Sequence, residues 1–195
     1  IGIACHIGKA DQRENLVTQT IGAFGRIDIL VNNAAINPVF GPIEDVDPAI
    51  FDKIMEVNVK APWSLSNLVL PHLKAHKNGS IINIASVEAL TPGFGLGIYS
   101  TSKAAILMLS KNQAKEWGKH GIRVNAICPG LIKTKFSAAL WQNEKILGKI
   151  QKTLPSERMG MPEEMVGLAC LLASDAGGYM TGGVYTADGG YMIAG

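Results

Sequence analysis

Two side chains that could exchange a proton lie one helical turn apart. Tyr99 and Lys103 frame the segment Tyr-Ser-Thr-Ser-Lys at the start of a predicted helix. Residues four apart share a helix face, with Cβ atoms about 6 Å apart. A free phenol has a pKa near ~10 and is a poor base at neutral pH. At an effective dielectric of about 20 a nearby ammonium favours the phenolate by about 2 pKa units. We therefore expect the pKa of Tyr99 to be lowered toward neutrality, where acid–base catalysis is efficient.

A hydroxyl group completes this arrangement. Ser86 follows a predicted apolar strand and precedes Tyr99 by thirteen positions. Its hydroxyl could donate to the substrate oxygen that Tyr99 protonates, and so stabilise the negative charge that develops there. Each feature alone has an ordinary explanation, because a Tyr-x-x-x-Lys spacing is common on helices and a serine often caps a turn. The combination favours chemistry on an alcohol/carbonyl pair.

The elements that must position these residues alternate between short apolar runs and helical patterns. The runs are rich in Ile and Val, as in strands buried on both faces. This alternation predicts an α/β fold, a doubly wound parallel sheet in one Rossmann-like domain over residues 1–195. The predicted strands are 2–5, 27–31, 80–85, 123–128 and 184–187. The predicted helices begin at Asp11, span about 47–76, run from Tyr99 to about Lys119, and begin at Pro162, with Asp11 and Glu14 as a capping box.

Ligands of such sheets bind beyond the carboxyl ends of the strands. The residues at those ends are polar or small, whereas the strands leading into them are apolar. They include Asn32 and Asn33, Ser86, Pro129 and Gly130, and residues 188–190. We expect them to meet at one edge of the sheet and to form the functional site.

Composition excludes several classes of function. With 47% hydrophobic residues, 17% charged residues and a net charge of +2, the chain has a globular composition, and no nucleic-acid partner is expected. No membrane span is expected either, because the longest apolar stretch, 165–173, is far shorter than about 20 residues. Three widely spaced cysteines indicate reduced thiols, and we expect a cytoplasmic protein. The tail 192–195 lacks a peroxisomal Ser-Lys-Leu address.

Several motifs occur together in one order. They include Asp-Ile-Leu-Val-Asn-Asn-Ala at 28–34, Val-Asn-Val at 57–59, Ser86 with the Tyr99–Lys103 pair, Arg-Val-Asn at 123–125, Pro-Gly-Leu-Ile-Lys-Thr at 129–134, and the segments 179–183 and 188–190. With these motifs the chain resembles the classical short-chain dehydrogenase/reductase family over essentially its whole length. The resemblance implies an NAD(P)-dependent oxidoreductase.

The resemblance also implies roles for single residues. Ser86, Tyr99 and Lys103 match the family's catalytic triad, and Asn58 matches an asparagine that holds a water on the lysine. An ordinary buried asparagine that satisfies backbone groups is the compatible alternative for Asn58. The implied cofactor-binding residues are Asn33, Tyr99, Lys103, Pro129, Gly130, Ile132, Thr134, His6 and Ile7, the last two beside the adenine.

Four segments, 5–10, 35–38, 58–62 and 130–134, resemble one branch of the family, the NADP-dependent carbonyl reductase/retinol dehydrogenase group. This likeness implies NADP as cofactor, with NAD as the alternative, small ketone, aldehyde or alcohol substrates, and a homotetramer. A 3-ketoacyl-carrier-protein reductase is a neighbouring alternative.

Two departures from the family pattern stand out. Ala35 occupies a position that is usually glycine, and would be strained if its φ were positive. The N-terminal strand–helix–strand unit with its glycine-rich turn is absent, and in a sheet of order 3-2-1-4-5-6 its strands belong between the predicted strands 2–5 and 27–31. We expect the 195 residues alone neither to fold stably nor to bind cofactor. A non-catalytic oligomerisation module is therefore the alternative from another class.

Other candidates are weaker. His72 and His76 have a spacing that zinc ligands can have, but there is no third ligand, and we expect no metal. The amphipathic segment 136–154 is either a lid over the substrate or a subunit contact. Apolar residues that could line a substrate pocket are Trp63, Phe94, Leu96, Phe136, Leu140 and Trp141.

Overall fold

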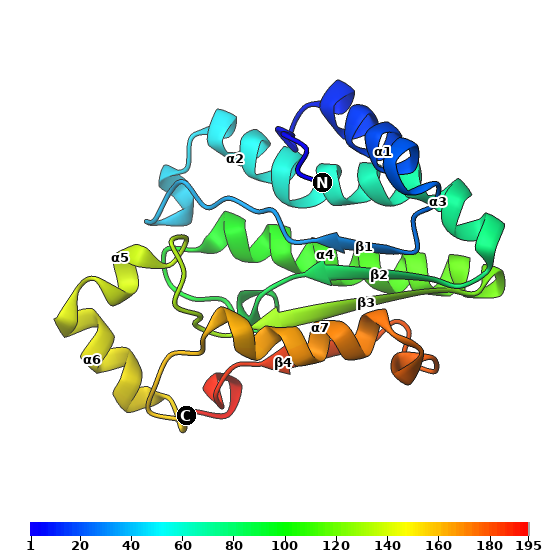
Figure 1. The fold of residues 1–195 in the computed structure, drawn as a ribbon. Helices are drawn as coiled ribbons and strands as arrows, with labels where there is room; N and C mark the ends of the chain where they lie inside the picture. The colour runs from blue at the N-terminus through cyan, green and yellow to red at the C-terminus, as the bar shows by residue number, and fades with distance from the viewer. Residues whose placement is uncertain (195) are drawn as a thin grey trace.

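A parallel sheet forms the centre of the computed structural model, which describes residues 1–194, apart from the side chains at positions 146 and 149–151. Within these residues the sheet has the order β1-β2-β3-β4 (Figure 1). The strands are β1 (Ile29–Asn32), β2 (Gly79–Ile84), β3 (Ile122–Pro129) and β4 (Val184–Ala187). The α/β class predicted from the alternating pattern is confirmed.

Helices cover both faces of this sheet. They are α1 (Ala10–Phe24), α2 (Pro48–Met55), α3 (Ala61–His76), α4 (Gly97–Trp117), α5 (Ala138–Trp141), α6 (Glu144–Thr153) and α7 (Val166–Ala173). Side chains along β2 alternate between the faces. Ile81 packs with the buried residues of α3 and α4, whereas Ile82 packs with Leu172 of α7. Helix α1 packs on α3, and α5 and α6 extend from the end of the sheet where β1 and β3 finish (Figure 1).

The strand predicted over residues 2–5 is wrong. This segment is not a strand, and the chain turns at His6–Lys9 into α1. A strand needs a neighbour for its backbone hydrogen bonds, and β1 is an edge strand of the sheet in the described residues, paired to β2. On β1, Ile29 and Val31 are each 47% exposed, although apolar strand residues of this kind are normally buried.

The predicted capping box of the first helix is also wrong. Lys9 occupies the N-cap of α1, without a side-chain cap, and Asp11 lies in the first turn, where an acidic group stabilises the helix dipole. By contrast, Asp47 does cap α2, because its Oδ1 accepts a hydrogen bond from the N–H of Ala49 at 2.7 Å. The helix expected to begin at Pro162 starts as a 3₁₀ turn (Pro162–Met165) before α7.

A π-helical turn (Glu56–Lys60) joins α2 to α3. The pattern over residues 47–76 predicts one continuous helix, and only the wider turn is unexpected. Such turns interrupt the regular ladder and often occur at functional sites. Here the turn contains Asn58, which is 1% exposed.

Buried polar side chains connect the sheet to its helices. The amide of Asn32 on β1 donates to Oδ1 of Asn83 on β2 at 2.8 Å, and the amide of Asn83 donates to Oγ of Ser110 on α4 at 2.8 Å. We call these three residues the polar ladder. Buried amides are costly unless paired, so the ladder fixes how β1, β2 and α4 pack.

Candidate active site

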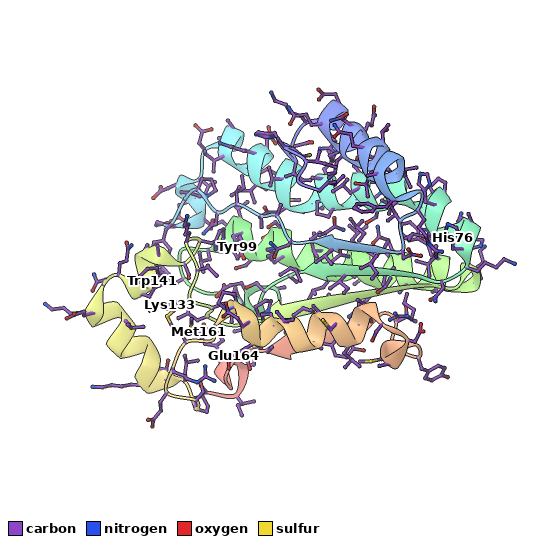
Figure 2. The ribbon with its side chains drawn as sticks, viewed as in Figure 1. His76, Tyr99, Lys133, Trp141, Met161 and Glu164 are labelled. Atoms are coloured by element: carbon purple, nitrogen blue, oxygen red, sulfur yellow. The ribbon has the colours of Figure 1, made fainter. Side chains whose placement is uncertain are left out.

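The residues singled out by their chemistry lie beyond the carboxyl end of the sheet. Figure 2 shows Tyr99 at the first turn of α4, on the side of the molecule that carries Lys133 and Trp141. His76 lies at the opposite end of the molecule. This is the edge at which the polar strand ends were expected to meet.

Ser86 connects the end of β2 to this site. It is 9% exposed, and its Oγ accepts a hydrogen bond from the N–H of Glu88 at 3.2 Å, which caps a short 3₁₀ helix (Val87–Ala89). The same hydroxyl lies near enough to the Tyr99 phenol to stabilise its ionised form. Ser86 therefore caps a turn and also lies beside the phenol, so the two interpretations of this serine are compatible.

The prediction that Lys103 lowers the pKa of Tyr99 toward neutrality is wrong for this structure. Burial raises the pKa of Tyr99 to about 12, the neighbouring Ser86 hydroxyl opposes this rise, and the Glu88 carboxylate adds to it. The phenolate loses solvation when buried. The Lys103 ammonium lies over the ring, with Nζ 5.6 Å from the ring centroid, and it is not among the groups that shift the pKa of Tyr99.

Lys103 itself is buried, with 3% of its surface exposed. Its Nζ donates a hydrogen bond to the carbonyl of Ile84 at 2.8 Å, at the end of β2. Burial lowers its pKa to about 8. Among the described residues the ammonium has this one hydrogen-bond acceptor, so two of its three donors remain for a ligand.

Asn58 makes three hydrogen bonds. Its Oδ1 accepts from the N–H of Ile36 at 2.8 Å, and its Nδ2 donates to the carbonyl of Ile36 at 2.9 Å and to Oγ of Ser102 at 3.0 Å. Ser102 precedes Lys103 on α4, so Asn58 ties the segment after β1 to the Tyr99–Lys103 turn. The interpretation of Asn58 as a buried, fully paired amide is thus confirmed, and its role in holding a water stays a prediction.

The end of β3 and the loop after it carry four of the predicted cofactor-binding residues. Gly130 lies against β4, because an added Cβ would be 2.6 Å from Cα of Asp188. Ile132 forms a β-bridge with Gly160. The N–H of Thr134 donates to Oγ of Ser137 at 3.1 Å, and Nε1 of Trp141 donates to the Thr134 carbonyl at 2.8 Å. Together with Pro129 these contacts hold the loop at the sheet edge.

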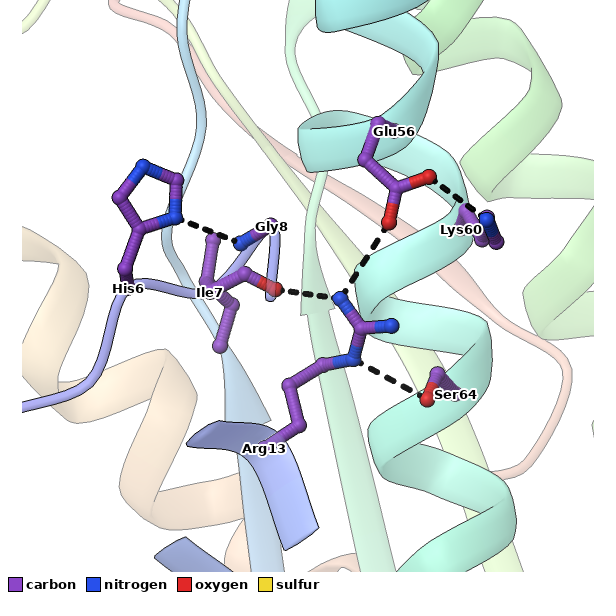
Figure 3. Close-up of polar contacts among 7 residues, drawn as sticks. All are labelled: His6, Ile7, Gly8, Arg13, Glu56, Lys60 and Ser64. Carbon is purple, nitrogen blue, oxygen red and sulfur yellow. Dashed lines mark hydrogen bonds and ion pairs between the residues drawn. The ribbon is translucent and has the colours of Figure 1, made fainter. Parts of the chain in front are cut away.

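The remaining cofactor candidates lie apart from this loop. Asn33 follows β1 and is exposed. His6 is exposed, and Ile7 is anchored through its carbonyl, which accepts a hydrogen bond from the buried Arg13 at 2.6 Å (Figure 3). Arg13 also donates to Oγ of Ser64 at 3.1 Å. The turn that contains His6 and Ile7 is therefore held against α3.

The pocket candidates divide into two groups. Phe136 packs on Tyr99, with ring centroids 6.0 Å apart, so the start of the lid segment reaches the site. Trp63 does not, because it lines a separate cavity of about 530 Å³ with Val59 of the π turn and Leu109 of α4. Phe94 is 84% exposed and Leu96 lies directly before α4. Trp141 and Leu140 belong to α5, and Lys133 lies over the Trp141 ring.

The backbone at position 35 does not require glycine. Ala35 does not have a positive φ, so its methyl group causes no strain there. His72 and His76 lie on α3, and the described residues contain no group of three or more His, Cys, Asp or Glu side chains that could hold a metal ion. No helix in the described part of the chain is long and apolar enough to cross a bilayer.

Sequence reasoning missed Glu88. Its carboxylate lies beside Tyr99 and accepts hydrogen bonds from the next loop and from α4. The available signal was an acidic residue two positions after Ser86, in a loop that is otherwise apolar or rich in glycine and proline.

Comparisons with known proteins agree with this geometry. Residues 1–192 match the family model described as enoyl-(acyl carrier protein) reductase. The chain is 43% identical over 189 residues to dehydrogenase/reductase SDR family member 4 of Oryctolagus cuniculus, covering 97% of this chain and 73% of the relative.

Solved structures are also similar. A gluconate 5-dehydrogenase from Burkholderia cenocepacia J2315, in complex with NADP and tartrate, superposes with a TM-score of 0.92 at 30% identity, over 97% of this chain and 74% of the other. A short-chain type dehydrogenase/reductase from Mycobacterium marinum gives a TM-score of 0.89 at 34% identity, over 98% and 75%.

Proposed function

Because the chain belongs to the short-chain dehydrogenase/reductase family of NAD(P)-dependent oxidoreductases, we propose that it interconverts an alcohol and a carbonyl compound as a carbonyl reductase/alcohol dehydrogenase. The observation that carries this proposal is the meeting of Ser86, Tyr99 and Lys103 at the carboxyl end of the sheet. The substrates are small ketones, aldehydes or alcohols.

Each side chain has a distinct task in this proposal. In reduction, the Tyr99 hydroxyl gives its proton to the carbonyl oxygen, while the Ser86 hydroxyl donates a hydrogen bond to the same oxygen. A phenol with a raised pKa is protonated at neutral pH and so is ready to act as the acid. Lys103, held by Ile84, supplies the ammonium from which Tyr99 is reprotonated, and Asn58 holds the relay water.

The donor groups of the site fit a nicotinamide cofactor, NADP or NAD. The two remaining Lys103 donors suit ribose hydroxyls, and Asn33 and the loop of Pro129, Gly130, Ile132 and Thr134 present polar and small groups at the same edge. His6 and Ile7 serve the adenine end. When bound, the cofactor supplies hydride to the carbonyl carbon, or accepts it in the reverse reaction. The solved gluconate 5-dehydrogenase with NADP supports NADP as the first choice.

A substrate panel tests the proposal directly. The complete protein is assayed with NADPH and with NADH against aromatic ketones, aldehydes and a 3-ketoacyl thioester, with absorbance at the nicotinamide band as the signal. We expect turnover of ketones or aldehydes. Preference for the thioester would instead identify a 3-ketoacyl reductase, and absence of turnover with every pair would contradict the proposed activity and favour a non-catalytic module.

We further propose that the protein is a homotetramer located in the cytoplasm. The support for self-association is an apolar stripe with four-residue spacing along α2, the π turn and α3, formed by Phe51, Met55, Val59 and Trp63. Phe51 is 40% and Trp63 is 49% exposed. A contiguous apolar surface of this kind is unfavourable in water and is typical of a contact surface.

Replacing Trp63 by Glu should therefore lower the mass of the assembly. A charge placed in an apolar contact is costly to bury, so we expect smaller species in sedimentation velocity at micromolar protein. The matched control is Phe24→Glu, at a 61% exposed position on α1 away from the stripe, which should leave the mass unchanged. Equal masses for wild type and Trp63→Glu would rule out this stripe as the contact.

A further inference from the structure

Both the backbone and the side chain of Glu88 make hydrogen bonds next to the active site. Its backbone N–H donates to Oγ of Ser86 at 3.2 Å. Its carboxylate Oε2 accepts from the N–H of Gly93 at 2.6 Å and from Oγ of Ser100 at 3.0 Å. One residue therefore connects the end of β2, the loop that follows it and the first turn of α4.

These contacts are close and partly buried. Ser100 is 6% exposed and follows Tyr99 directly, so its bond to Glu88 holds the turn that carries the phenol. A Cβ added at Gly93 would lie 2.9 Å from Oε1 of Glu88, so the glycine lets the loop approach the carboxylate. Hydrogen bonds to a charged acceptor are stronger than bonds between neutral groups.

The charge of Glu88 also acts on the phenols around it. It raises the pKa of Tyr99 and also that of Tyr191. For both phenols burial raises the pKa more than the Glu88 charge does. The other titratable groups here are Lys103, on the helix of Tyr99, and Cys128 on β3, which lies near Lys103 and whose thiol pKa is raised by burial. Of these three groups, Glu88 is the one with a carboxylate.

We propose that Glu88 is a positioning residue of the active site, which holds Ser86 and the Tyr99 turn in one arrangement through its hydrogen bonds and keeps a negative charge beside the phenol. The catalytic part of this inference rests on the proposed function, whereas the structural part does not. Its charge thereby adds to the effect of burial, which is the larger influence on the pH at which Tyr99 releases its proton.

Two substitutions separate the hydrogen bonds from the charge. Glu88→Gln keeps an acceptor for Gly93 and Ser100 and removes the charge, whereas Glu88→Ala removes both. The matched control is Glu116→Gln, at an exposed position near the far end of α4. Hydrogen exchange of the amides in segment 90–100 reports on the hydrogen bonds, and the pH profile of alcohol oxidation reports on the charge.

We expect exchange in this segment to be at least about fivefold faster in Glu88→Ala, equivalent to about 1 kcal/mol, and near wild type in Glu88→Gln. We expect Glu88→Gln to displace the pH profile toward acid by about half a unit or more, because loss of the negative charge makes the phenol easier to ionise. The control should change neither.

The outcomes are distinguishable. Unchanged exchange in Glu88→Ala would overturn the positioning role, whether or not the protein turns over substrate. Faster exchange with an unmoved pH profile in Glu88→Gln would overturn the role of the charge. If the wild type shows no turnover, the proposed function fails and with it the charge role, while hydrogen exchange still decides the positioning role.

Discussion

Replacing Tyr99 by Phe is expected to reduce kcat for carbonyl reduction by at least about 100-fold, the usual contribution of a positioned general acid. Phenylalanine keeps the aromatic ring that packs on Phe136 and lies beneath Lys103, so the fold of the site should persist. What is lost is the proton that the carbonyl oxygen receives. Stopped-flow or steady-state kinetics at saturating cofactor measures the effect.

The matched control for this substitution is Tyr179→Phe. Tyr179 is fully exposed and lies outside the site, so its hydroxyl should contribute nothing to turnover. Near-normal kcat in Tyr99→Phe, with circular dichroism unchanged, would remove Tyr99 from the mechanism. Equal losses in both variants would indicate a general effect of phenol removal rather than catalysis.

Replacing Lys103 by Met should abolish most activity and yet change stability in a pH-dependent way. The pKa of Lys103 is about 8 in the folded chain, against 10.5 for the free side chain, because burial disfavours the ammonium. Below pH 8 both states are protonated, and the folded state bears the full cost of the buried charge, on the order of 3 kcal/mol. This cost is relieved as the pH rises from 8 to 10.5, so the wild type gains stability over that range.

A methionine carries no charge and does not share this gain. We therefore expect the free energy of unfolding of Lys103→Met, relative to wild type, to fall by about 3 kcal/mol between pH 7 and pH 10.5. At pH 7 the variant should be about as stable as wild type, since the relief is offset by loss of the bond to the Ile84 carbonyl, about 1–3 kcal/mol.

Urea unfolding at both pH values provides the measurement, with Lys115→Met, at an exposed position on α4, as the control. A stability difference independent of pH would show that Lys103 is not a buried ammonium with a lowered pKa. Retention of turnover in Lys103→Met would contradict its part in the proton relay.

Much of the fold could be predicted from local patterns. The strand at 184–187 has the observed bounds, and the helix expected from Tyr99 to Lys119 is found at Gly97–Trp117. Apolar residues in these elements bury themselves with the period that the pattern shows. The segment 2–5 has an equally good strand pattern and is not a strand, because pairing depends on a neighbouring strand and not on local sequence.

The sequence predicts which residues form the candidate site, but not how the site shifts their pKa values. Ser86, Tyr99 and Lys103 do lie together, because parallel strands and the helices after them end at one edge. The direction of the Tyr99 pKa shift was wrong, since spacing along a helix reveals the nearby ammonium but not the loss of water around the phenol. The role of Glu88 was not predicted for a related reason. Its hydrogen bonds to Gly93 and Ser100 depend on the conformation of a loop, and a periodic sequence pattern does not predict loop conformation.

The polar ladder of Asn32, Asn83 and Ser110 has a consequence for how the sheet assembles. A shift of β1 by two residues along β2 would return every apolar side chain to its proper face, so hydrophobic burial alone barely discriminates against it. Such a shift would, however, separate Asn32 from Asn83, whose side chains are joined by a hydrogen bond of 2.8 Å from Nδ2 to Oδ1. It would leave two amides in the interior without this bond. The polar ladder thus discriminates against misaligned pairing of β1 with β2. It thereby fixes the position along the sheet at which the chain leaves these strands beside Tyr99.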